Sequence, residues 1–330
     1  MEMSSGDLGP GARRELADEP TGVGPEGHRG FRRVFGGAGL TLGLFFAIES
    51  YAGAVPSMRD QLELAVRAEE VGFAALWVRD VPLLDPSFGD AGQVFDPWVY
   101  LGQVAAATQH VALATGGIVL PLRHPLHVAK AAASVDVLSG GRFLLGVAGG
   151  DRPVEYPAFG VGYADRAERF REAVALVRVA LGESFPRVSS SFGVLGGDVD
   201  VIPKPTGGRL PLLAVGSAGQ TNAWLAANVD GLVSYPRPPA VQRRVVDAWG
   251  LASTCAPFAQ SLYVDLVADA GRAPSPIHLG HRLGAHRLVE VLDDLRGIGV
   301  RHVVLNLKYG SRPAAAVLED IGTMVLPKLA

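Results

Sequence analysis

The chain has 330 residues, of which 48% are hydrophobic and 19% charged, and its formal net charge at pH 7 is −3. A chain of this length can bury a large core, either as one barrel or as two smaller domains. It has no basic surplus to follow a polyphosphate backbone, so a small-molecule ligand is expected rather than nucleic acid. The one cysteine, Cys255, excludes an intrachain disulfide and a cysteine zinc cluster, which fits a reducing, cytoplasmic compartment.

The start of the chain differs in composition from the rest. Residues 1–35 are rich in Gly, Pro, Glu and Arg without apolar periodicity, which predicts a disordered tail followed by one folded domain over 36–330. Arg32 and Arg33 precede an apolar stretch and resemble a twin-arginine export signal. The preferred interpretation makes 40–46 the first buried strand of the fold. No segment supplies the roughly 18 uninterrupted apolar residues of a membrane helix, so no membrane association is expected.

Short apolar runs and helical patterns alternate along the remainder of the chain. Strands are predicted at 40–46, 74–80, 111–119, 142–148, 211–216, 231–235, 259–267 and 300–307, and helices at 58–71, 97–110, 126–138, 165–181, 219–228, 238–250, 285–297 and 313–326. Residues 183–209 lack helical periodicity and are expected to form an inserted loop with a short hairpin.

This alternation predicts an α/β fold, a (β/α)8 TIM barrel with an insertion after the fourth β/α unit. Each strand is a nearly continuous apolar run, as expected of a parallel strand buried on both faces. The alternative is an open doubly wound sheet, which would place a G-x-G-x-x-G fingerprint after the first strand. That fingerprint does not follow 40–46.

The active site of a (β/α)8 barrel lies where the strands end, so the residues directly after each strand are the candidates. Cations dominate this predicted rim. Its polar members are Arg79, Asp80, Arg123, His124, Asp151, Arg152, Tyr235, Arg237, Lys308 and Tyr309.

The segment from 212 to 224 runs from a buried strand through Gly216 and Ser217 into a helix. Exposed N–H groups and hydroxyls at such a junction form a phosphate site. The alternative is that Ser217 and Thr221 only cap the helix.

Two glycine pairs stand at other strand ends. Gly149 and Gly150 let a ligand approach the backbone directly, although a plain strand-to-helix turn would also need them. Gly116 and Gly117 interrupt a β-branched strand, which marks either close approach of a ligand or a bulge.

Hydrolytic and metal-dependent chemistry have weaker support. His124 and His127 are three residues apart near a helix start, but no H-E-x-x-H or H-x-x-E-H pattern accompanies them, so no metal site is expected. Ser217 lies in V-G-S-A-G, which does not match the G-x-S-x-G nucleophile motif. A site with backbone donors and arginines but without an evident nucleophile suits chemistry carried by a cofactor.

Several of these segments together resemble the luciferase-like monooxygenase superfamily, flavin-dependent (β/α)8 barrels related to bacterial luciferase. They are residues 96–151, 156–173, Lys204 with Pro205, and 211–221. The resemblance runs from about Leu40 to the end of the chain, whose last part is similar to a subgroup of uncharacterised luciferase-type oxidoreductases.

The resemblance implies FMN, or alternatively the deazaflavin F420, at the mouth of the barrel. It places a non-proline cis peptide at Gly116–Gly117 beneath the ring system and the phosphate near the loop after the fifth strand. The implied cofactor-binding residues are Gly116, Gly117, Ala148, Gly149, Gly150, Asp151, Ser217, Ala218, Gly219, Gln220 and Thr221. Ala148 and Gly149 stand where bacterial luciferase has a cysteine and a phosphate-binding arginine, so aldehyde oxidation of the luciferase type is not expected.

The predicted function is a flavin-dependent oxidoreductase, a monooxygenase that uses reduced FMN and O2 on a small organic substrate. Arg79, Asp80, His124, Arg152 and Tyr235 are the predicted catalytic residues. The alternatives are an F420-dependent hydride-transfer enzyme, whose acidic tail would favour the Arg-rich rim, a non-catalytic flavin-binding barrel, and a metal-dependent hydrolase. A homodimer and a separate flavin reductase are the expected protein partners.

Overall fold

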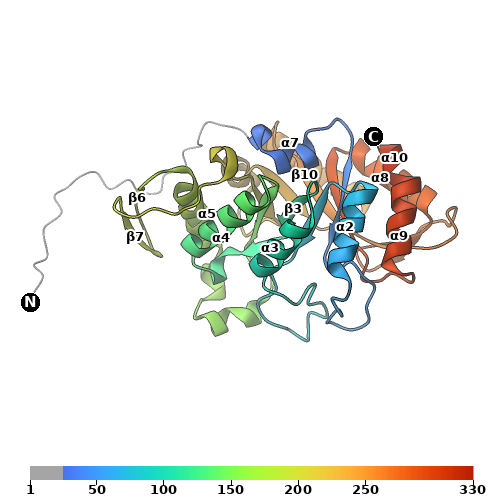
Figure 1. Cartoon of the computed structure of the whole chain (residues 1–330), viewed down its shortest axis with the longest axis horizontal. Helices are drawn as coiled ribbons and strands as arrows, with labels where there is room; N and C mark the ends of the chain where they lie inside the picture. The colour runs from blue at the N-terminus through green and yellow to red at the C-terminus, as the bar shows by residue number, and fades with distance from the viewer. Residues whose placement is uncertain (1–24, 330) are drawn as a thin grey trace, which may run out of the picture.

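Eight parallel strands form a closed ring at the centre of the computed structural model, which describes residues 25–329 (Figure 1). In ring order they are β1 (Thr41–Phe45), β2 (Ala75–Val78), β3 (Ala112–Thr115), β5 (Phe143–Ala148), β8 (Leu212–Val215), β9 (Gly231–Ser234), β10 (Phe258–Leu266) and β13 (Val300–Asn306). β1 pairs in parallel with both β2 and β13, which closes the ring. The predicted (β/α)8 barrel is therefore confirmed, and the open-sheet alternative is wrong.

Helices follow the strands and cover the outside of the ring; α2 to α5 lie side by side in Figure 1. They are α2 (Gln61–Val71), α3 (Pro97–Ala107), α4 (Pro125–Leu138), α5 (Arg166–Gly182), α6 (Asn222–Asn228), α7 (Pro239–Ala252), α8 (Ala285–Gly297), α9 (Ala314–Asp320) and α10 (Leu326–Leu329), with a π-helical turn over Ile321–Val325. Asp96 caps α3 as predicted, because its side chain accepts from the N–H groups of Trp98 and Val99.

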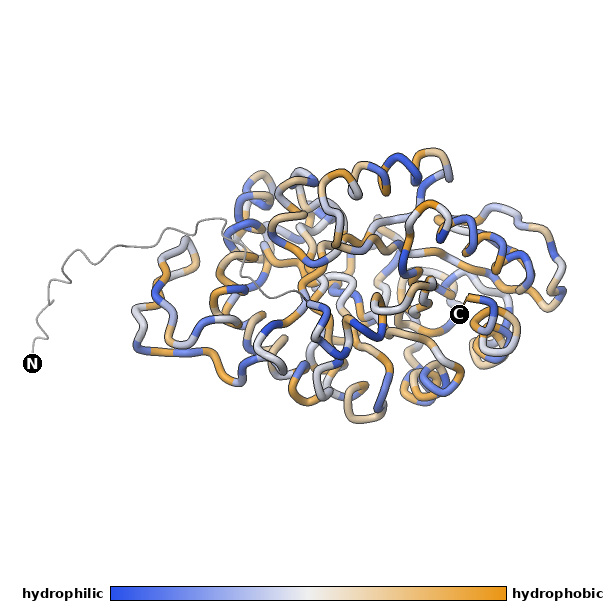
Figure 2. The backbone as a smooth tube through the Cα atoms, turned by 90° about the horizontal axis from the view of Figure 1, so that it is seen from above, coloured by the Kyte–Doolittle hydropathy of each residue, from blue (hydrophilic) through white to orange (hydrophobic). Residues whose placement is uncertain are grey.

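The core has an inner and an outer part, because successive strand residues point to opposite faces of the ring. Phe45, Trp77, Leu144 and Val304 fill the interior, and a larger set packs between strands and helices. In Figure 2 the surface helices alternate between hydrophilic and hydrophobic residues along their turns, as expected for helices packed on one side only.

A histidine lies inside the barrel. His302 on β13 is fully buried; its Nε2 accepts from Trp77 Nε1 at 3.1 Å and its Nδ1 lies 2.7 Å from Thr41 Oγ1. Gly43 provides the space, since a Cβ at that position would lie 2.7 Å from His302 Nε2. Burial lowers the pKa of His302 to about 3, so the imidazole is neutral in the folded protein.

A short helix, α1 (Arg29–Phe35), covers the amino-terminal end of the barrel, preceded by a 3-10 turn over Pro25–Gly27. Phe31 and Val34 are buried in the same cluster as the barrel interior, where they fill the open end of the ring. The predicted disordered tail is therefore wrong for residues 25–35, and residues 1–24 lie outside the described part of the chain. The apolar stretch after the arginine pair is β1, a central strand.

Two β-hairpins lie outside the regular alternation of strands and helices. The predicted insertion over 183–209 carries the hairpin of β6 (Arg187–Ser190) and β7 (Gly193–Gly196), which lies beside α5 at one end of the molecule in Figure 1. A second hairpin, β11 (Ser275–Ile277) with β12 (Gly280–Leu283), was not predicted; β12 extends the sheet alongside the end of β10. Within residues 25–329 no helix is both long and apolar enough to cross a membrane.

Candidate active site

Five polar side chains meet where the strands of the barrel end, around the carboxylate of Asp90. They are Tyr51, Arg79, Asp90, Tyr263 and Lys308, and we refer to them as the Asp90 cluster. They come from the loops after β1 and β2, from β10, and from the residues that follow β13. The carboxyl ends of parallel strands thus bring together residues that are far apart in the sequence.

The carboxylate of Asp90 is held on both oxygens. Oδ1 accepts from the Tyr51 hydroxyl at 2.6 Å and from the Gly92 N–H at 2.9 Å, and it lies 3.3 Å from Lys308 Nζ. Oδ2 accepts from Arg79 Nη1 at 2.8 Å and from the Tyr263 hydroxyl at 3.4 Å. This single buried carboxylate therefore fixes two cations and two phenols.

The protonation states follow from these contacts. Burial alone would raise the pKa of Asp90, but the Arg79 charge and the hydrogen bonds from Tyr51, Arg79 and Gly92 hold it well below the usual range. Burial, with the Asp90 charge adding to it, raises the pKa of Tyr263 to about 12. Asp90 is thus ionised and Tyr263 neutral at neutral pH.

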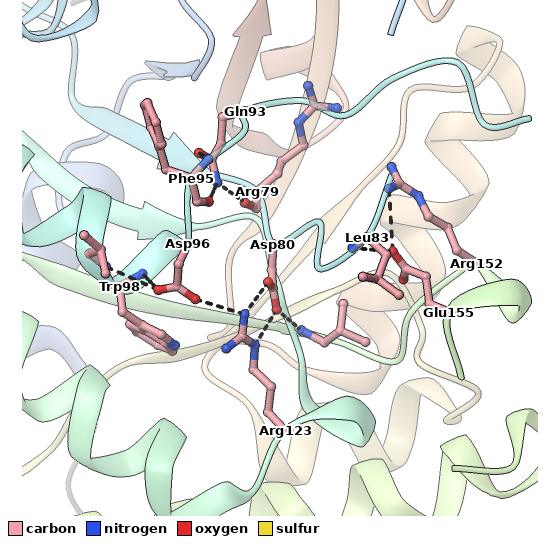
Figure 3. A network of polar contacts seen from close by, with 12 residues as sticks. Arg79, Asp80, Leu83, Gln93, Phe95, Asp96, Trp98, Arg123, Arg152 and Glu155 are labelled. Carbon is pink, nitrogen blue, oxygen red and sulfur yellow. Dashed lines mark hydrogen bonds and ion pairs between the residues drawn. The ribbon is translucent and has the colours of Figure 1, made fainter. Parts of the chain in front are cut away.

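Asp80, the next residue after Arg79, forms a second ion pair. Its carboxylate accepts from Arg123 Nε at 2.9 Å and Nη2 at 2.7 Å, and from the Val119 N–H at 3.0 Å (Figure 3). This bidentate geometry joins the end of β2 to the segment after β4 (Ile118–Val119). Asp80 is buried and its contacts are made within the protein, which indicates a positioning role.

Arg152 joins two loops. It follows β5, opens the 3-10 segment η3 (Pro153–Phe159), and is only 7% exposed. Its Nη2 donates to the Asp90 carbonyl at 2.8 Å, its Nη1 lies 3.9 Å from Glu155, and its guanidinium lies over the Phe88 ring at 4.2 Å. Glu155 also accepts from the Leu83 N–H at 3.3 Å (Figure 3). These contacts form a bridge between the loops after β2 and β5.

The cationic rim predicted from the sequence is therefore largely neutralised. Arg79 and Lys308 pair with Asp90, Arg123 pairs with Asp80, and Arg152 lies beside Glu155. Arg237 differs, because it donates to Ser234 Oγ and the Tyr235 carbonyl and has no carboxylate partner among residues 25–329.

Two phenols at the mouth remain available to a ligand. Tyr235 is 53% exposed and Tyr309 is 37% exposed, and neither hydroxyl has a hydrogen-bond partner in the described part of the chain. The Tyr309 ring packs against those of Tyr263 and His278, at centroid distances of 5.3 and 5.7 Å. His278 comes from the turn of the β11–β12 hairpin, so that hairpin contributes to the mouth.

His124 lies apart from the Asp90 cluster. Its Nδ1 accepts from the Leu126 N–H as the N-cap of α4, and its Nε2 lies 3.1 Å from the Phe192 carbonyl in the β6–β7 turn. These contacts give His124 a structural role that accounts for both ring nitrogens. His127 is close, with ring centroids 5.8 Å apart, but no group of three metal-ligating side chains occurs within residues 25–329.

Glycines line the ends of β3 and β5. The peptide bond between Gly116 and Gly117 is cis, at the position that the resemblance implied, and it separates β3 from β4. A Cβ at Gly116 would lie 2.6 Å from Phe45 Cε1, and one at Gly117 would lie 2.9 Å from the Gly146 carbonyl carbon. Ala148 ends the neighbouring strand β5, and Gly149 follows it so close to Ala218 that a Cβ at position 149 would lie 3.0 Å from the Ala218 Cα.

The loop after β8 makes a tight turn, and its residue Gly216 faces open space. Gly216 and Gly219 have φ angles of +73° and +75°, and Ala218 has a φ of +49°. Gln220 Nε2 donates to the Ala167 carbonyl at 2.8 Å, which fixes the loop on α5. Thr221 caps α6, as the structural alternative predicted, whereas Ser217 is exposed and its hydroxyl has no partner within the described residues.

Arg79, Asp80, Arg152 and Tyr235 lie at the mouth, as the sequence predicts, whereas Asp90 and its partners Tyr51 and Tyr263 are not among the predicted site residues. The interval between β2 and α3 exceeds the usual length of a connection, and such loops are commonly functional. That length was the one available signal for Asp90.

A closed (β/α)8 barrel with polar side chains and small-residue loops gathered at its carboxyl end defines a barrel enzyme. Residues 40–264 match the family described as luciferase-like monooxygenase. The chain belongs to this family and is an oxidoreductase. The resemblance seen in the sequence is thereby confirmed.

Two similar proteins have different descriptions, one as uncharacterised and one as a monooxygenase. An uncharacterised protein of Mycobacterium tuberculosis is 32% identical over 205 residues, which cover 56% of this chain and 72% of that protein. The 4-hydroxyprotoasukamycin monooxygenase of Streptomyces nodosus subsp. asukaensis is 34% identical over 164 residues, which cover 49% of this chain and 42% of that enzyme.

Solved structures with the same fold hold either of two cofactors. An F420-dependent secondary alcohol dehydrogenase in complex with an F420-acetone adduct has a TM-score of 0.73 and 18% identity, over 88% of this chain and 99% of that one. The oxygenating constituent of 3,6-diketocamphane monooxygenase of Pseudomonas putida, in complex with FMN, has a TM-score of 0.71 and 16% identity over the same shares. At these identities the likeness concerns the fold.

Proposed function

We propose that the protein is an FMN-dependent monooxygenase that uses reduced FMN and O2 on a small organic substrate. The observation that carries this proposal is the contrast between two parts of the barrel mouth. Glycine or alanine stands at or directly after the ends of the neighbouring strands β3, β5 and β8, whereas β2, β10 and β13 lead into the Asp90 cluster. A flat ring can lie against the first part while a substrate faces the second.

The residues present fit an isoalloxazine with a phosphate tail. Gly116, Ala148 and Gly149 place no bulky side chain at the ends of β3 and β5, where a planar ring can lie, and the loop after β8 offers N–H groups and the free Ser217 hydroxyl for an anion. Gly216 faces open space, since a Cβ there would have no atom within 4 Å. Bound FMN would supply the redox chemistry that the side chains of this site lack.

The side chains have separate roles in this proposal. The Tyr235 hydroxyl, free and half exposed, donates a hydrogen bond to the substrate. Arg79 presents a guanidinium held in place by Asp90, so its charge faces the reacting groups in one fixed orientation. Asp80 and Arg152 act as positioning residues because their polar atoms bind protein groups.

The pairing of the rim cations favours FMN over F420. The acidic tail of F420 would gain from unpaired arginines, but Arg79, Arg123 and Arg152 each lie against a carboxylate. These three paired arginines attract a polyanion weakly, because each already has a partner at short range, whereas Arg237 has no carboxylate partner among residues 25–329. F420-dependent hydride transfer is the alternative, since one structural neighbour holds that cofactor.

The proposal includes two protein partners, a flavin reductase and a second copy of the chain. Reduced flavin would be supplied by a separate flavin reductase. We propose that the protein acts as a homodimer. Light scattering coupled to size exclusion tests the dimer, and oxygen uptake with and without an added flavin reductase tests the second partner.

A titration with FMN and with F420, each oxidised and reduced, tests the cofactor. Absorbance and fluorescence report binding, and micromolar or tighter affinity for FMN is expected. Tighter binding of F420 would select the alternative. Binding of neither cofactor would contradict both, and oxygen uptake without product would favour a barrel that binds flavin but lacks catalysis.

Replacing Gly216 by alanine is expected to weaken FMN binding about tenfold, because the new methyl group occupies the open edge of the loop after β8. Gly207→Ala is the matched control. Gly207 has a φ of +75°, close to the +73° of Gly216, and it also faces open space, but it lies in the insertion. Both variants carry the same backbone cost, so equal losses of FMN affinity would show that Gly216 does not face the cofactor.

A further inference from the structure

Four large apolar side chains are exposed on the two loops that Arg152 joins. Leu83 is 42%, Leu84 55% and Phe88 44% exposed in the loop after β2, and Val154 is 64% exposed on η3. We refer to these four as the apolar rim. Isolated exposed apolar residues are ordinary, but several on two loops in contact indicate a surface that receives a ligand.

The contacts of the bridge place the apolar rim at the mouth. β3 lies between β2 and β5 in the ring, so the loops that follow β2 and β5 meet across the end of β3. The Leu83 N–H donates to Glu155, the residue after Val154, and Figure 3 shows the Glu155 carboxylate directed at the backbone of Leu83. The Gly116–Gly117 pair directly follows β3, and the proposed function places it under the cofactor.

The Phe88 ring contacts a cation and is 44% exposed. Arg152 lies 4.2 Å from the ring centroid and is itself only 7% exposed, so the ring shields the guanidinium from a ligand. The ammonium group of Lys308 is also held by protein groups. Its Nζ donates to the carbonyls of Gly53 and Gly89 at 2.9 Å and lies 3.3 Å from the Asp90 carboxylate. Neither cation can hold an anionic group without first breaking these bonds.

We infer that the substrate is an uncharged, apolar organic molecule, which the apolar rim contacts as it enters over the end of β3. This inference rests on the proposed function, because it takes the mouth as the reaction site. Burial of part of Leu84 and Phe88 against such a molecule is favourable. A carboxylate or phosphate ester would lose solvation there and find Arg152 and Lys308 already occupied.

Equilibrium dialysis of two matched probes, 2-naphthol and 2-naphthoate, against the full-length protein at pH 7 tests the inference. The uncharged naphthol is expected to bind at least about tenfold more tightly than the anionic naphthoate, since the anion must be desolvated against the apolar rim while Arg152 is held by its own contacts. Leu84→Ser and Phe88→Ser are each expected to weaken naphthol binding about fivefold to tenfold, the loss of one partly buried apolar side chain.

Leu251→Ser is the control, because Leu251 is 90% exposed on α7, in a part of the chain that does not belong to the mouth. It should leave naphthol binding unchanged. Naphthoate binding as tightly as naphthol, or equal losses in Leu251→Ser and Phe88→Ser, would overturn the inference. A change of oligomeric state in Leu84→Ser or Phe88→Ser without a change in naphthol binding would also overturn it, since a second copy would then cover the rim.

The FMN titration separates this inference from the proposed function. If FMN binds and naphthoate is preferred, only the substrate class is wrong. If neither FMN nor F420 binds, the proposed function fails whichever probe is preferred.

Discussion

Asp90→Ala is expected to lower the free energy of unfolding by about 3–5 kcal/mol, the usual cost of removing one partner of a buried ion pair. The substitution leaves the Arg79 and Lys308 charges without their shared carboxylate, and it leaves the Tyr51 and Tyr263 hydroxyls without an acceptor. Urea unfolding monitored by circular dichroism measures the loss. A loss below 1 kcal/mol would show that solvent replaces the carboxylate and that the cluster is not a structural centre of the mouth.

Asp90→Asn separates shape from charge. The amide keeps an acceptor oxygen for one phenol but removes the negative charge. The pKa of Tyr263 should then fall below its value of about 12, because Asp90 contributes to raising it. Spectrophotometric titration of the tyrosines detects this change, and Tyr263→Phe identifies the residue responsible. A Tyr263 pKa unaltered by Asp90→Asn would contradict the charge coupling.

Acidification is expected to destabilise the protein through His302 well before Asp90 contributes. The pKa of His302 is about 3 in the folded protein and 6.5 in a model peptide, so the unfolded chain binds the proton first as pH falls. The stability from keeping His302 neutral is complete above about pH 6.5 and decreases as pH falls towards 3. Linkage gives a slope of about 1.4 kcal/mol per pH unit within that interval.

His302→Gln provides the comparison, since it removes this titration and retains polar atoms near Trp77 and Thr41. Unfolding free energies of the two proteins at pH 6, 5 and 4 give the slope that belongs to His302. The variant should be less stable at pH 7 yet lose less stability on acidification. Equal slopes would show that His302 is protonated inside the barrel, contrary to its burial. Asp90 does not produce this difference, because both proteins contain it and its stabilisation begins to be lost only near the unfolded-state pKa of 3.8.

Local signals in the sequence are sufficient to predict the strands and helices of the barrel. Asp96 before Pro97 and His124 before Pro125 fix the starts of α3 and α4, because a capping side chain and a proline at the first position satisfy the orphan N–H groups. The continuous apolar runs identified all eight barrel strands. The glycine pair at 116–117 was also informative, since so few backbone environments require two adjacent glycines.

The parts that were missed depend on contacts between distant segments. α1 has only seven residues, and Phe31 and Val34 are informative only once the barrel end that they fill is known. Asp90 lies in an irregular loop, and its partners Tyr51 and Lys308 stand 39 positions before it and more than 200 after it. His124 was assigned to catalysis because a cap and a catalytic histidine look alike in a sequence.

The pairing of β1 with β13 has a consequence for synthesis on the ribosome. Thr41 and His302, which the closed ring places side by side, are 261 residues apart in the chain. β1 therefore emerges from the ribosome long before its second neighbour and exposes an unpaired edge until β13 is available. An exposed strand edge pairs readily with other chains, so the nascent protein depends on chaperones or fast elongation more than the finished barrel does.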